Sequence, residues 1–268
     1  PLASHVPVVL MDGWDAERAL RLIDAYRVTH THMVPVMFRR LLELPREDRA
    51  QYDVSSLRVV VHGAAPCPRG VKQQMIDWFG PVFYEYYAAT EGWGCYADSA
   101  EWLARPGTVG RPAPGDVEIR DFEGKSLPPG REGVVYLRVK TRAAFAGDYF
   151  TLGDVGLLDA DGYLYLRDRS ADVINVGGMN VYPAEVDAVL VEHRAVKDVA
   201  TVGAPDDEWG ERVVSVVELT DGFVASDGLA AELRALCERE LASFKCPREI
   251  VFREALPRLD NGKIYRRV

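Results

Sequence analysis

The sequence predicts an α/β chain in three parts, and three observations support this fold class. Short apolar runs alternate with amphipathic helical patterns over residues 1–105, which indicates a parallel-rich α/β subdomain. Short strand patterns separated by Pro-Gly and Asp-Gly turns over residues 106–168 predict a small antiparallel β-barrel or sheet. Residues 169–268 mix helix and strand patterns and predict a compact α+β C-terminal domain.

The elements expected in the first part alternate regularly along the chain. Apolar runs predict strands at residues 6–10, 31–34 and 57–61. Helical periodicity predicts helices at residues 16–26, 36–44 and 69–79. Because strands that alternate with helices pair in parallel, we expect a mostly parallel sheet that binds ligands beyond the carboxyl ends of its strands.

The other two parts differ from the first in the kind and order of the elements that their sequences predict. In the second part, strands are expected at residues 116–120, 133–140 and 162–166. In the third part, helices are expected at residues 183–193 and 228–243, and strands at residues 199–202, 213–220 and 250–252. Asp168 and Arg169 stand between the two parts, so we expect a hinge or linker there.

Charge and cysteine content exclude several classes of partner. The chain has 32 basic and 41 acidic residues, and its net charge of −9 argues against nucleic acid or an anionic membrane surface as the main partner. No stretch approaches the roughly 18 consecutive apolar residues of a membrane-spanning helix. The four cysteines have neither paired nor metal-ligand spacing, so reduced thiols in a cytoplasmic protein are the simplest interpretation.

The first candidate binding motif directly follows an expected strand. Gly63, Ala64, Ala65 and Pro66 come after the apolar run 57–61, at the position where open α/β sheets bind ligands. Small side chains there would let a flat group lie against the backbone. An ordinary turn between a strand and a helix is the alternative interpretation.

The second candidate motif is an aromatic run that ends in small and polar residues. Tyr87 can stack on a base, Thr90 can donate to a phosphate oxygen, and Glu91 can hold a magnesium ion, which prefers oxygen ligands. One nucleotide–metal complex would use all three. Core tyrosines and a helix-capping threonine are the structural alternative, although the order of the residues favours the nucleotide.

Two further motifs occur later in the chain. Asp154 follows a glycine at the end of a strand-like segment, where its carboxylate could accept hydrogen bonds from a ribose diol; a surface turn is the alternative. Gly177 and Gly178 stand between a strand pattern and a helix that starts near Pro183. These glycines either allow close approach of a ligand or form a hairpin.

A lysine near the end of the chain is the best single indication of function. Lys263 follows the turn-forming run 260–262, so its flexible side chain could reach across a cleft to phosphate or carboxylate oxygens. The alternative is a solvated basic tail that ends in Arg266 and Arg267.

Taken together, these motifs make the chain resemble the acyl-CoA synthetases of the adenylate-forming superfamily, which also includes adenylation domains and beetle luciferases. Five signatures occur in the family's order and spacing from Gly63 to Lys263. The tracts 101–112 and 177–186 are most similar to fatty-acyl-CoA ligases rather than to peptide-synthetase modules. The resemblance implies an ATP-dependent ligase that activates a carboxylic acid as acyl-AMP, releases pyrophosphate and transfers the acyl group to coenzyme A.

The resemblance also implies which residues would hold the adenine ring. By similarity with the family, the ring would lie against Gly63, Ala64, Ala65, Pro66 and Tyr87.

Five residues would then contact the rest of the nucleotide by resemblance. Thr90 would bind the α-phosphate and Glu91 the magnesium ion. Asp154 would bind the ribose hydroxyls, Arg169 the ribose or a phosphate, and Lys263 would bridge the substrate carboxylate and the α-phosphate.

The resemblance further implies that the C-terminal domain is a mobile lid. It would rotate about residues 168–172 between acyl-AMP formation and thiolysis by coenzyme A. Gly177 and Gly178 would then line the pantetheine channel. Relatives often carry a charged residue where this chain has Ala171, so the pivot residue is left open.

Two departures from the family pattern concern the acid pocket. Relatives usually have glycine where this chain has Ala88, and small residues where it has Trp93. Trp93 would narrow the pocket, with Val34 and Phe38 as further walls. We therefore expect a short, cyclic or aromatic acid rather than a long straight chain.

The family's Ser/Thr/Gly-rich phosphate loop, which ends in Lys-Gly, is not found between Pro1 and Val268. We therefore expect a missing N-terminal part of the same enzyme and little adenylation by this chain alone. Two alternatives stay open. The chain could be a non-catalytic nucleotide-binding fragment, or it could serve an enzyme that transfers the acyl group to a carrier-protein thiol.

Overall fold

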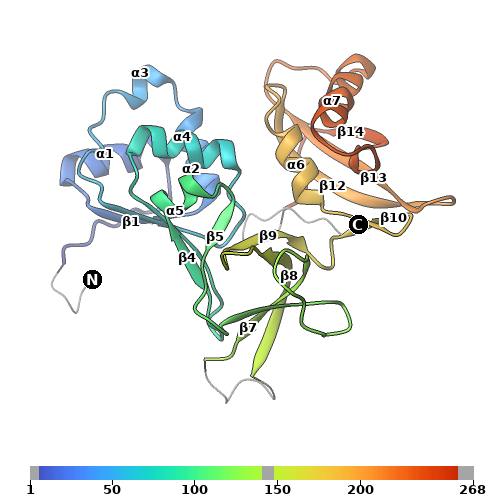
Figure 1. Cartoon of the computed structure of the whole chain (residues 1–268). Helices are drawn as coiled ribbons and strands as arrows, with labels where there is room; N and C mark the ends of the chain where they lie inside the picture. Colours follow the sequence, from blue (N-terminus) through green and yellow to red (C-terminus); the bar gives the residue numbers. More distant parts are fainter. Residues whose placement is uncertain (1–5, 141–147, 259–268) are drawn as a thin grey trace.

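The computed structural model describes residues 6–140 and 148–258, which contain three sheets, each with its own hydrophobic core (Figure 1). The first sheet consists of β1 (His30–Met33), β2 (Val59–His62), β3 (Phe83–Tyr87) and β4 (Cys95–Asp98), in that order. β1, β2 and β3 are parallel, and β4 is antiparallel to β3. The predicted parallel-rich α/β fold is confirmed.

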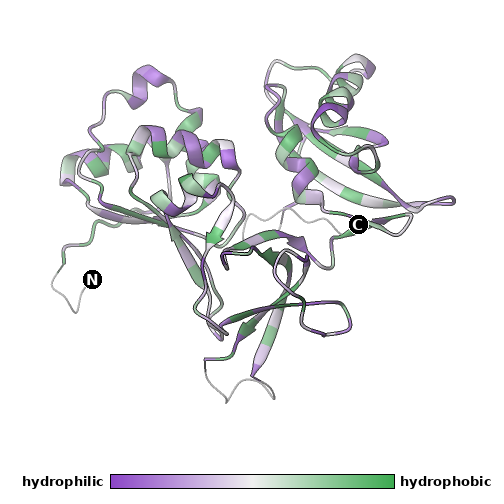
Figure 2. Cartoon of the chain, in the orientation of Figure 1, coloured by the Kyte–Doolittle hydropathy of each residue, from purple (hydrophilic) through white to green (hydrophobic). Residues whose placement is uncertain are grey.

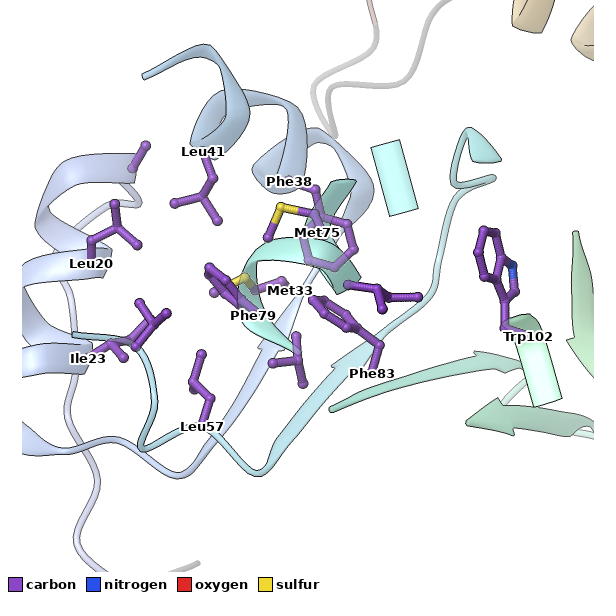
Figure 3. Close-up of a cluster of buried hydrophobic side chains, with 14 residues drawn as sticks. Leu20, Ile23, Met33, Phe38, Leu41, Leu57, Met75, Phe79, Phe83 and Trp102 are labelled. Carbon is purple, nitrogen blue, oxygen red and sulfur yellow. The ribbon is translucent and has the colours of Figure 1, made fainter. Parts of the chain in front are cut away.

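Helices cover one face of this sheet (Figure 1). They are α1 (Ala16–Tyr26), α2 (Pro35–Glu43), α4 (Arg69–Phe79) and α5 (Ser99–Ala104), whereas the short α3 (Arg46–Arg49) buries no residue and stands away from the sheet. Asp15 caps α1 by accepting a hydrogen bond from the Arg18 amide at 2.8 Å, and α2 begins at a proline, whose fixed φ suits a first turn. The apolar sides of α1, α2 and α4 pack against the inward-facing residues of the strands; Leu20 of α1, Phe38 of α2 and Phe83 of β3 belong to this core (Figure 3).

The predicted strand at residues 6–10 is wrong. This segment pairs with no strand in the described part of the chain, and Leu10 is 83% exposed. An apolar run becomes a strand only where a neighbouring strand can satisfy its backbone hydrogen bonds, and the described sheet begins at β1 instead.

The middle sheet is antiparallel, as predicted. It has the order β5-β9-β8-β7-β6. Its strands are β5 (Thr108–Gly110), β6 (Val117–Arg120), β7 (Gly133–Arg138), β8 (Tyr149–Leu158) and β9 (Leu164–Arg169).

This sheet is open rather than a closed barrel, because its two end strands, β5 and β6, do not pair with each other in the described residues. β5 also lies close to β4 of the first sheet: a Cβ atom on Gly110 would be 2.0 Å from the Tyr96 carbonyl oxygen.

The third sheet has the order β11-β10-β13-β12, and β14 pairs in parallel with β13. Its strands are β10 (Ile174–Val176), β11 (Met179–Val181), β12 (Val196–Asp206), β13 (Gly210–Leu219) and β14 (Glu249–Arg253). Helices α6 (Pro183–Leu190) and α7 (Asp227–Glu240) pack on it around Val186, Val217 and Leu233. The predicted α+β character of this part is confirmed.

Contacts from two elements, β9 and α2, are among those that connect the third part to the rest of the described residues. The Ala184 amide, in the first turn of α6, donates to the Asp168 carboxylate of β9 at 2.6 Å. On α2, the Arg39 guanidinium donates to the Lys197 carbonyl and lies 3.6 Å from the Asp198 carboxylate. The junction expected at residues 168–169 therefore carries a direct hydrogen bond to the first helix of the C-terminal part.

Hydropathy follows this arrangement. Hydrophobic residues lie mainly along the strands and the sheet-facing sides of the helices, whereas the short α3 is hydrophilic (Figure 2). Within the described ranges, no helix combines the length and the apolar character that crossing a membrane requires. All four cysteines lie in the described residues, and none forms a disulfide.

Candidate active site

The loop at residues 63–66 leaves the carboxyl end of β2. Gly63 is buried, and a Cβ atom there would lie 2.7 Å from the Tyr86 carbonyl oxygen, so a larger residue would require a backbone shift. Ala64, Ala65 and Pro66 are exposed, and Ala64 has a left-handed φ of 68°. The loop therefore presents backbone and small side chains to the outside, which is the kind of surface that a flat ring can approach.

Tyr87, Asp154 and Arg169 come from three different strands and meet where the first and middle sheets adjoin. The Tyr87 hydroxyl at the end of β3 donates to Asp154 Oδ2 of β8 at 2.7 Å. Arg169 Nε at the end of β9 lies 2.9 Å from Asp154 Oδ1, and Arg169 Nη1 donates to the Leu152 carbonyl at 2.7 Å. β8 and β9 pair Asp154 directly with Arg169, so the sheet register brings these two side chains together.

The chemistry of this cluster suits a neutral diol. Burial raises the pKa of Tyr87, and the nearby Asp154 carboxylate raises it further, so the phenol stays protonated as a donor. The Asp154 side chain is only 13% exposed. Each oxygen of an ionised carboxylate has more than one lone pair, so Asp154 can accept further hydrogen bonds while it keeps both protein partners.

The segment that follows Tyr87 is arranged differently. Thr90 and Glu91 are exposed. The backbone, rather than the side chains, fixes their position: the Lys140 amide donates to the Glu91 carbonyl at 2.9 Å, and the Trp93 amide donates to the Arg138 carbonyl at 2.9 Å. The end of β7 thus holds this segment while its polar side chains remain accessible.

The donor set fits a magnesium ion only when a ligand supplies most of the oxygens. In the ranges 6–140 and 148–258, no group of three or more His, Cys, Asp or Glu side chains could hold a metal ion. Magnesium in nucleotide enzymes is typically held by one or two carboxylates together with phosphates and water. Glu91, an exposed carboxylate, could supply one such ligand.

The three residues expected to line the acid pocket have different surroundings. Trp93 is 48% exposed, and the Lys140 ammonium lies 5.1 Å from the centre of its ring. Val34 is half-buried and caps the start of α2. Phe38 is fully buried and packs edge-on against His62. Trp93 is thus the most exposed of the three, and their pocket role stays a prediction.

Gly177 and Gly178 form the turn between β10 and β11, with left-handed φ values of 56° and 84°. A Cβ atom on Gly177 would lie 2.6 Å from the Trp209 indole, whereas nothing lies within 4 Å of a Cβ atom on Gly178. Trp209 was not singled out in the sequence. The spacing between the two residues gives no signal of their contact, which depends on the pairing of β10 with β13.

Lys263 lies outside the described residues, so its predicted position relative to the nucleotide site has no structural description. The remaining predicted nucleotide residues fall into two groups. Tyr87, Asp154 and Arg169 are joined by side-chain interactions, while Thr90 and Glu91 follow Tyr87 directly in sequence on an exposed segment.

The fold agrees with the comparisons to known proteins. Residues 1–146 match the family model of the AMP-binding enzyme, and residues 185–263 match that of the AMP-binding enzyme C-terminal domain. The first match alone covers more than half of the 268 residues. The chain therefore belongs to the AMP-binding enzyme family.

Three relatives illustrate the range of this family. The mitochondrial acyl-coenzyme A synthetase ACSM5 of Homo sapiens is 33% identical over 99% of this chain and 49% of its own length. The fatty acid–[acyl-carrier-protein] ligase ScoC of Streptomyces coeruleorubidus is 34% identical over 97% of this chain and 53% of its own. The amide bond synthetase McbA of Marinactinospora thermotolerans superposes with a TM-score of 0.82 at 32% identity, over 95% of this chain and 55% of the other. The chain thus spans about half the length of these relatives.

Proposed function

We propose that this chain belongs to an ATP-dependent acyl-CoA ligase that activates a carboxylic acid as acyl-AMP and then transfers the acyl group to coenzyme A. The observation that best supports the proposal is the cluster of Tyr87, Asp154 and Arg169. These residues are separated by up to 82 positions (169 − 87), yet hydrogen bonds and an ion pair join them in one site. A ribose diol is the ligand that this carboxylate is best suited to accept.

In the proposed complex, the remaining nucleotide groups extend along the neighbouring segments. The adenine ring lies against the 63–66 loop and Tyr87, and the ribose binds Asp154 with help from Arg169. Thr90 donates to the α-phosphate, and Glu91 provides one ligand of the magnesium ion. This assignment agrees with the exposure of Thr90 and Glu91 and of the small side chains in the loop.

The proposed reaction requires positive charge at the phosphate. A carboxylate that attacks a polyanionic nucleotide meets repulsion, and two unit charges roughly 4 Å apart cost about 4 kcal/mol at an effective dielectric constant near 20. Lys263 and the magnesium ion would offset this cost and stabilise the charge that develops as pyrophosphate leaves. No protein nucleophile is needed, so none of the four cysteines has a role in the proposed chemistry.

We also propose that the three parts of the chain, residues 1–105, 106–168 and 169–268, act as two subdomains and a lid. The lid would turn about residues 168–172 between the two half-reactions, which would bring Gly177 and Gly178 to the pantetheine of coenzyme A. The left-handed φ and open surroundings of Gly178 agree with close approach of a ligand to this turn.

The same proposal includes the remaining half of the enzyme. Because the chain spans about half the length of its relatives, we propose that adenylation requires the N-terminal part of such a ligase beside it. On the acid side, the exposed indole of Trp93 supports a short, cyclic or aromatic acid.

A second candidate differs only in the acceptor of the acyl group. ScoC is named for transfer to an acyl-carrier protein and McbA for amide bond synthesis, at identities similar to that of ACSM5. A carrier-protein thiol or an amine is therefore the alternative acceptor.

The test uses the whole protein that carries this chain. Acid-dependent exchange of pyrophosphate into ATP is measured over a panel of carboxylic acids, and the best acid is then offered with coenzyme A, a holo acyl-carrier protein or an amine. We expect exchange and a coenzyme A thioester. Absence of exchange with every acid, in a protein that still binds AMP, would instead favour the non-catalytic nucleotide-binding alternative.

A further inference from the structure

A buried ion pair lies beneath the 63–66 loop. Lys72, in the first turn of α4, donates from Nζ to Glu85 Oε2 of β3 at 2.5 Å. Lys72 is 0% exposed and Glu85 6% exposed. Burial raises the pKa of Glu85, and the Lys72 ammonium opposes this shift. Charged side chains are rarely buried to this degree, and their desolvation can cancel the benefit of the pairing.

The surroundings of the pair are mostly aromatic and apolar. The Lys72 ammonium lies 4.9 Å from the centre of the Trp102 ring, which is part of the core in Figure 3. His62, the last residue of β2, is paired with Glu85 in the sheet register, and its Nε2 lies 4.0 Å from Glu85 Oε2. Burial lowers the pKa of His62 to about 3, so its ring is neutral and leaves Lys72 as the cation that pairs with Glu85.

The position of the pair in the chain links it to the loop. Residues 63–68 connect β2 to α4, and the Lys72 amide starts the helix by donating to the Pro68 carbonyl at 3.0 Å. The loop begins at β2, which is hydrogen-bonded to β3, and it ends at α4, which Lys72 attaches to the same strand. Both ends of the loop are therefore fixed to β3.

The amino-acid sequence of the 63–66 loop does not by itself favour the backbone conformation that the loop adopts. Ala64 has a φ of 68°, in the left-handed region that residues with a Cβ atom rarely adopt. Such a conformation persists when the surrounding structure imposes it, and it is found preferentially at functional sites. An apolar pair could fill the space of Lys72 and Glu85 equally well, but it would lack the directed hydrogen bond between α4 and β3.

We propose that Lys72 and Glu85 are positioning residues, which hold Ala64 in its left-handed conformation and so keep the 63–66 loop in the shape that the adenine ring contacts. The identity of the ligand in this inference rests on the proposed function. The pair does not touch the nucleotide; it acts through the backbone of the loop.

The experiment separates positioning from stability by replacing the pair as a whole. The double variant Lys72→Met/Glu85→Leu keeps the volume and removes both charges, so its melting temperature should stay within a few degrees of the parent. We nevertheless expect AMP to bind about tenfold more weakly. Adding Ala64→Gly should recover most of this loss, because glycine adopts a left-handed φ without support.

Two controls define the effect. Ala64→Gly is also made in the parent chain. The ratio of its effect on AMP affinity in the double variant to its effect in the parent measures the coupling between Ala64 and the ion pair. Lys245→Met breaks the Lys245–Glu185 ion pair of the C-terminal part and should leave AMP affinity unchanged. A double variant that binds AMP as tightly as the parent would overturn the proposal.

A second readout does not depend on the nucleotide. In protein labelled with ¹³C-alanine, the Ala64 chemical shifts report its backbone conformation, and we expect the left-handed signature in the parent to be lost in the double variant. An unchanged signature would also overturn the proposal. If the parent shows the signature but binds no AMP, the proposed function fails while the role of the pair in the loop is still tested. Should the double variant not fold, Lys72→Arg keeps the charge, crowds the closed space and should shift the Ala64 signal in the same direction.

Discussion

The two sides of the candidate nucleotide site differ in whether contacts within the protein hold their side chains in place. On the ribose side, Tyr87, Asp154 and Arg169 are connected to one another, and the Asp154 side chain is only 13% exposed. On the phosphate side, Thr90 and Glu91 are exposed, and only their backbone is fixed by the end of β7.

This difference follows the charge of the proposed ligand. A neutral diol gains little long-range attraction, so the groups that bind it benefit from being held in place beforehand. Phosphates and magnesium interact strongly with charged groups, and a buried carboxylate without its cation would be costly. Glu91 is therefore better left in solvent until the nucleotide and the metal arrive.

The largest expected effect concerns the phosphate side. Lys263→Ala should slow acyl-AMP formation by about 100-fold or more, because a cation that stabilises the transition state is removed. Pyrophosphate exchange by the whole protein measures this loss, while AMP affinity should change only slightly. The exposed Lys125, changed to Ala, is the matched control. If Lys263→Ala exchanges as fast as the parent, the lysine has no part in the chemistry.

The next effect concerns the ribose side. Asp154→Ala should weaken AMP binding about 10- to 100-fold, because the diol loses its acceptor and Tyr87 and Arg169 lose their shared partner. Titration calorimetry measures the affinity. Asp161→Ala, in the exposed turn between β8 and β9, removes a comparable carboxylate and should have no effect. Equal losses in both variants would argue against a specific ribose site.

A smaller effect is expected at the acid pocket. Trp93→Gly should shift the preference toward longer acids by about tenfold or more in relative kcat/KM, since one methylene in an apolar pocket is worth roughly 1 to 3 kcal/mol. Profiling acids of increasing chain length with the whole protein checks this. Tyr96→Gly, at another exposed aromatic residue, is the control. An unchanged chain-length profile would remove Trp93 from the pocket.

The smallest effect concerns pH and the buried first sheet. His62 has a pKa of about 3 in the folded chain, below its ordinary value of 6.5, so the unfolded chain binds more protons between these values. Stability should therefore fall as pH decreases below about 6.5. The raised pKa of Glu85 acts in the opposite direction above its ordinary value of 4.5, with Lys72 and His32 as the other facing charges.

The measurement is the urea midpoint at pH 7.5 and at pH 5.5. His62→Leu should show a smaller decrease between the two pH values than the parent, whereas a change of the exposed His30 to Gln should not alter it. A decrease of the same size in His62→Leu would assign the pH dependence to other groups.

Much of the fold follows from local patterns in the sequence. Alternating apolar and helical segments predicted the parallel sheet because each element there buries one regular face. The strand expected at residues 6–10 is wrong because pairing depends on a neighbouring edge, which local hydropathy does not report. The open middle sheet differs from the expected barrel for a related reason, because closure requires the end strands β5 and β6 to pair, and local strand patterns do not report such pairing.

The candidate site was likewise predictable from the sequence only in part. Residue type and order pointed to Tyr87 and Asp154, and the family resemblance pointed to Arg169, but their interactions arise from the register of β8 and β9 and from the approach of β3. No role was assigned to Glu85 from the sequence, although the strand pattern contained a signal. Glu85 is two residues after Phe83 and therefore lies on the same, buried face of β3. A charged residue in a core-facing strand position predicts a buried partner, but not that the partner is Lys72 on a helix.

The ribose assignment can be tested most directly by comparing AMP with 2′,3′-dideoxy-AMP in calorimetric titrations of the parent and of Asp154→Ala. We expect the parent to bind AMP about 10- to 100-fold more tightly than the dideoxy analogue, and the difference to disappear in Asp154→Ala. Equal affinity of the parent for the two nucleotides would contradict the assignment of the Tyr87, Asp154 and Arg169 cluster to the ribose.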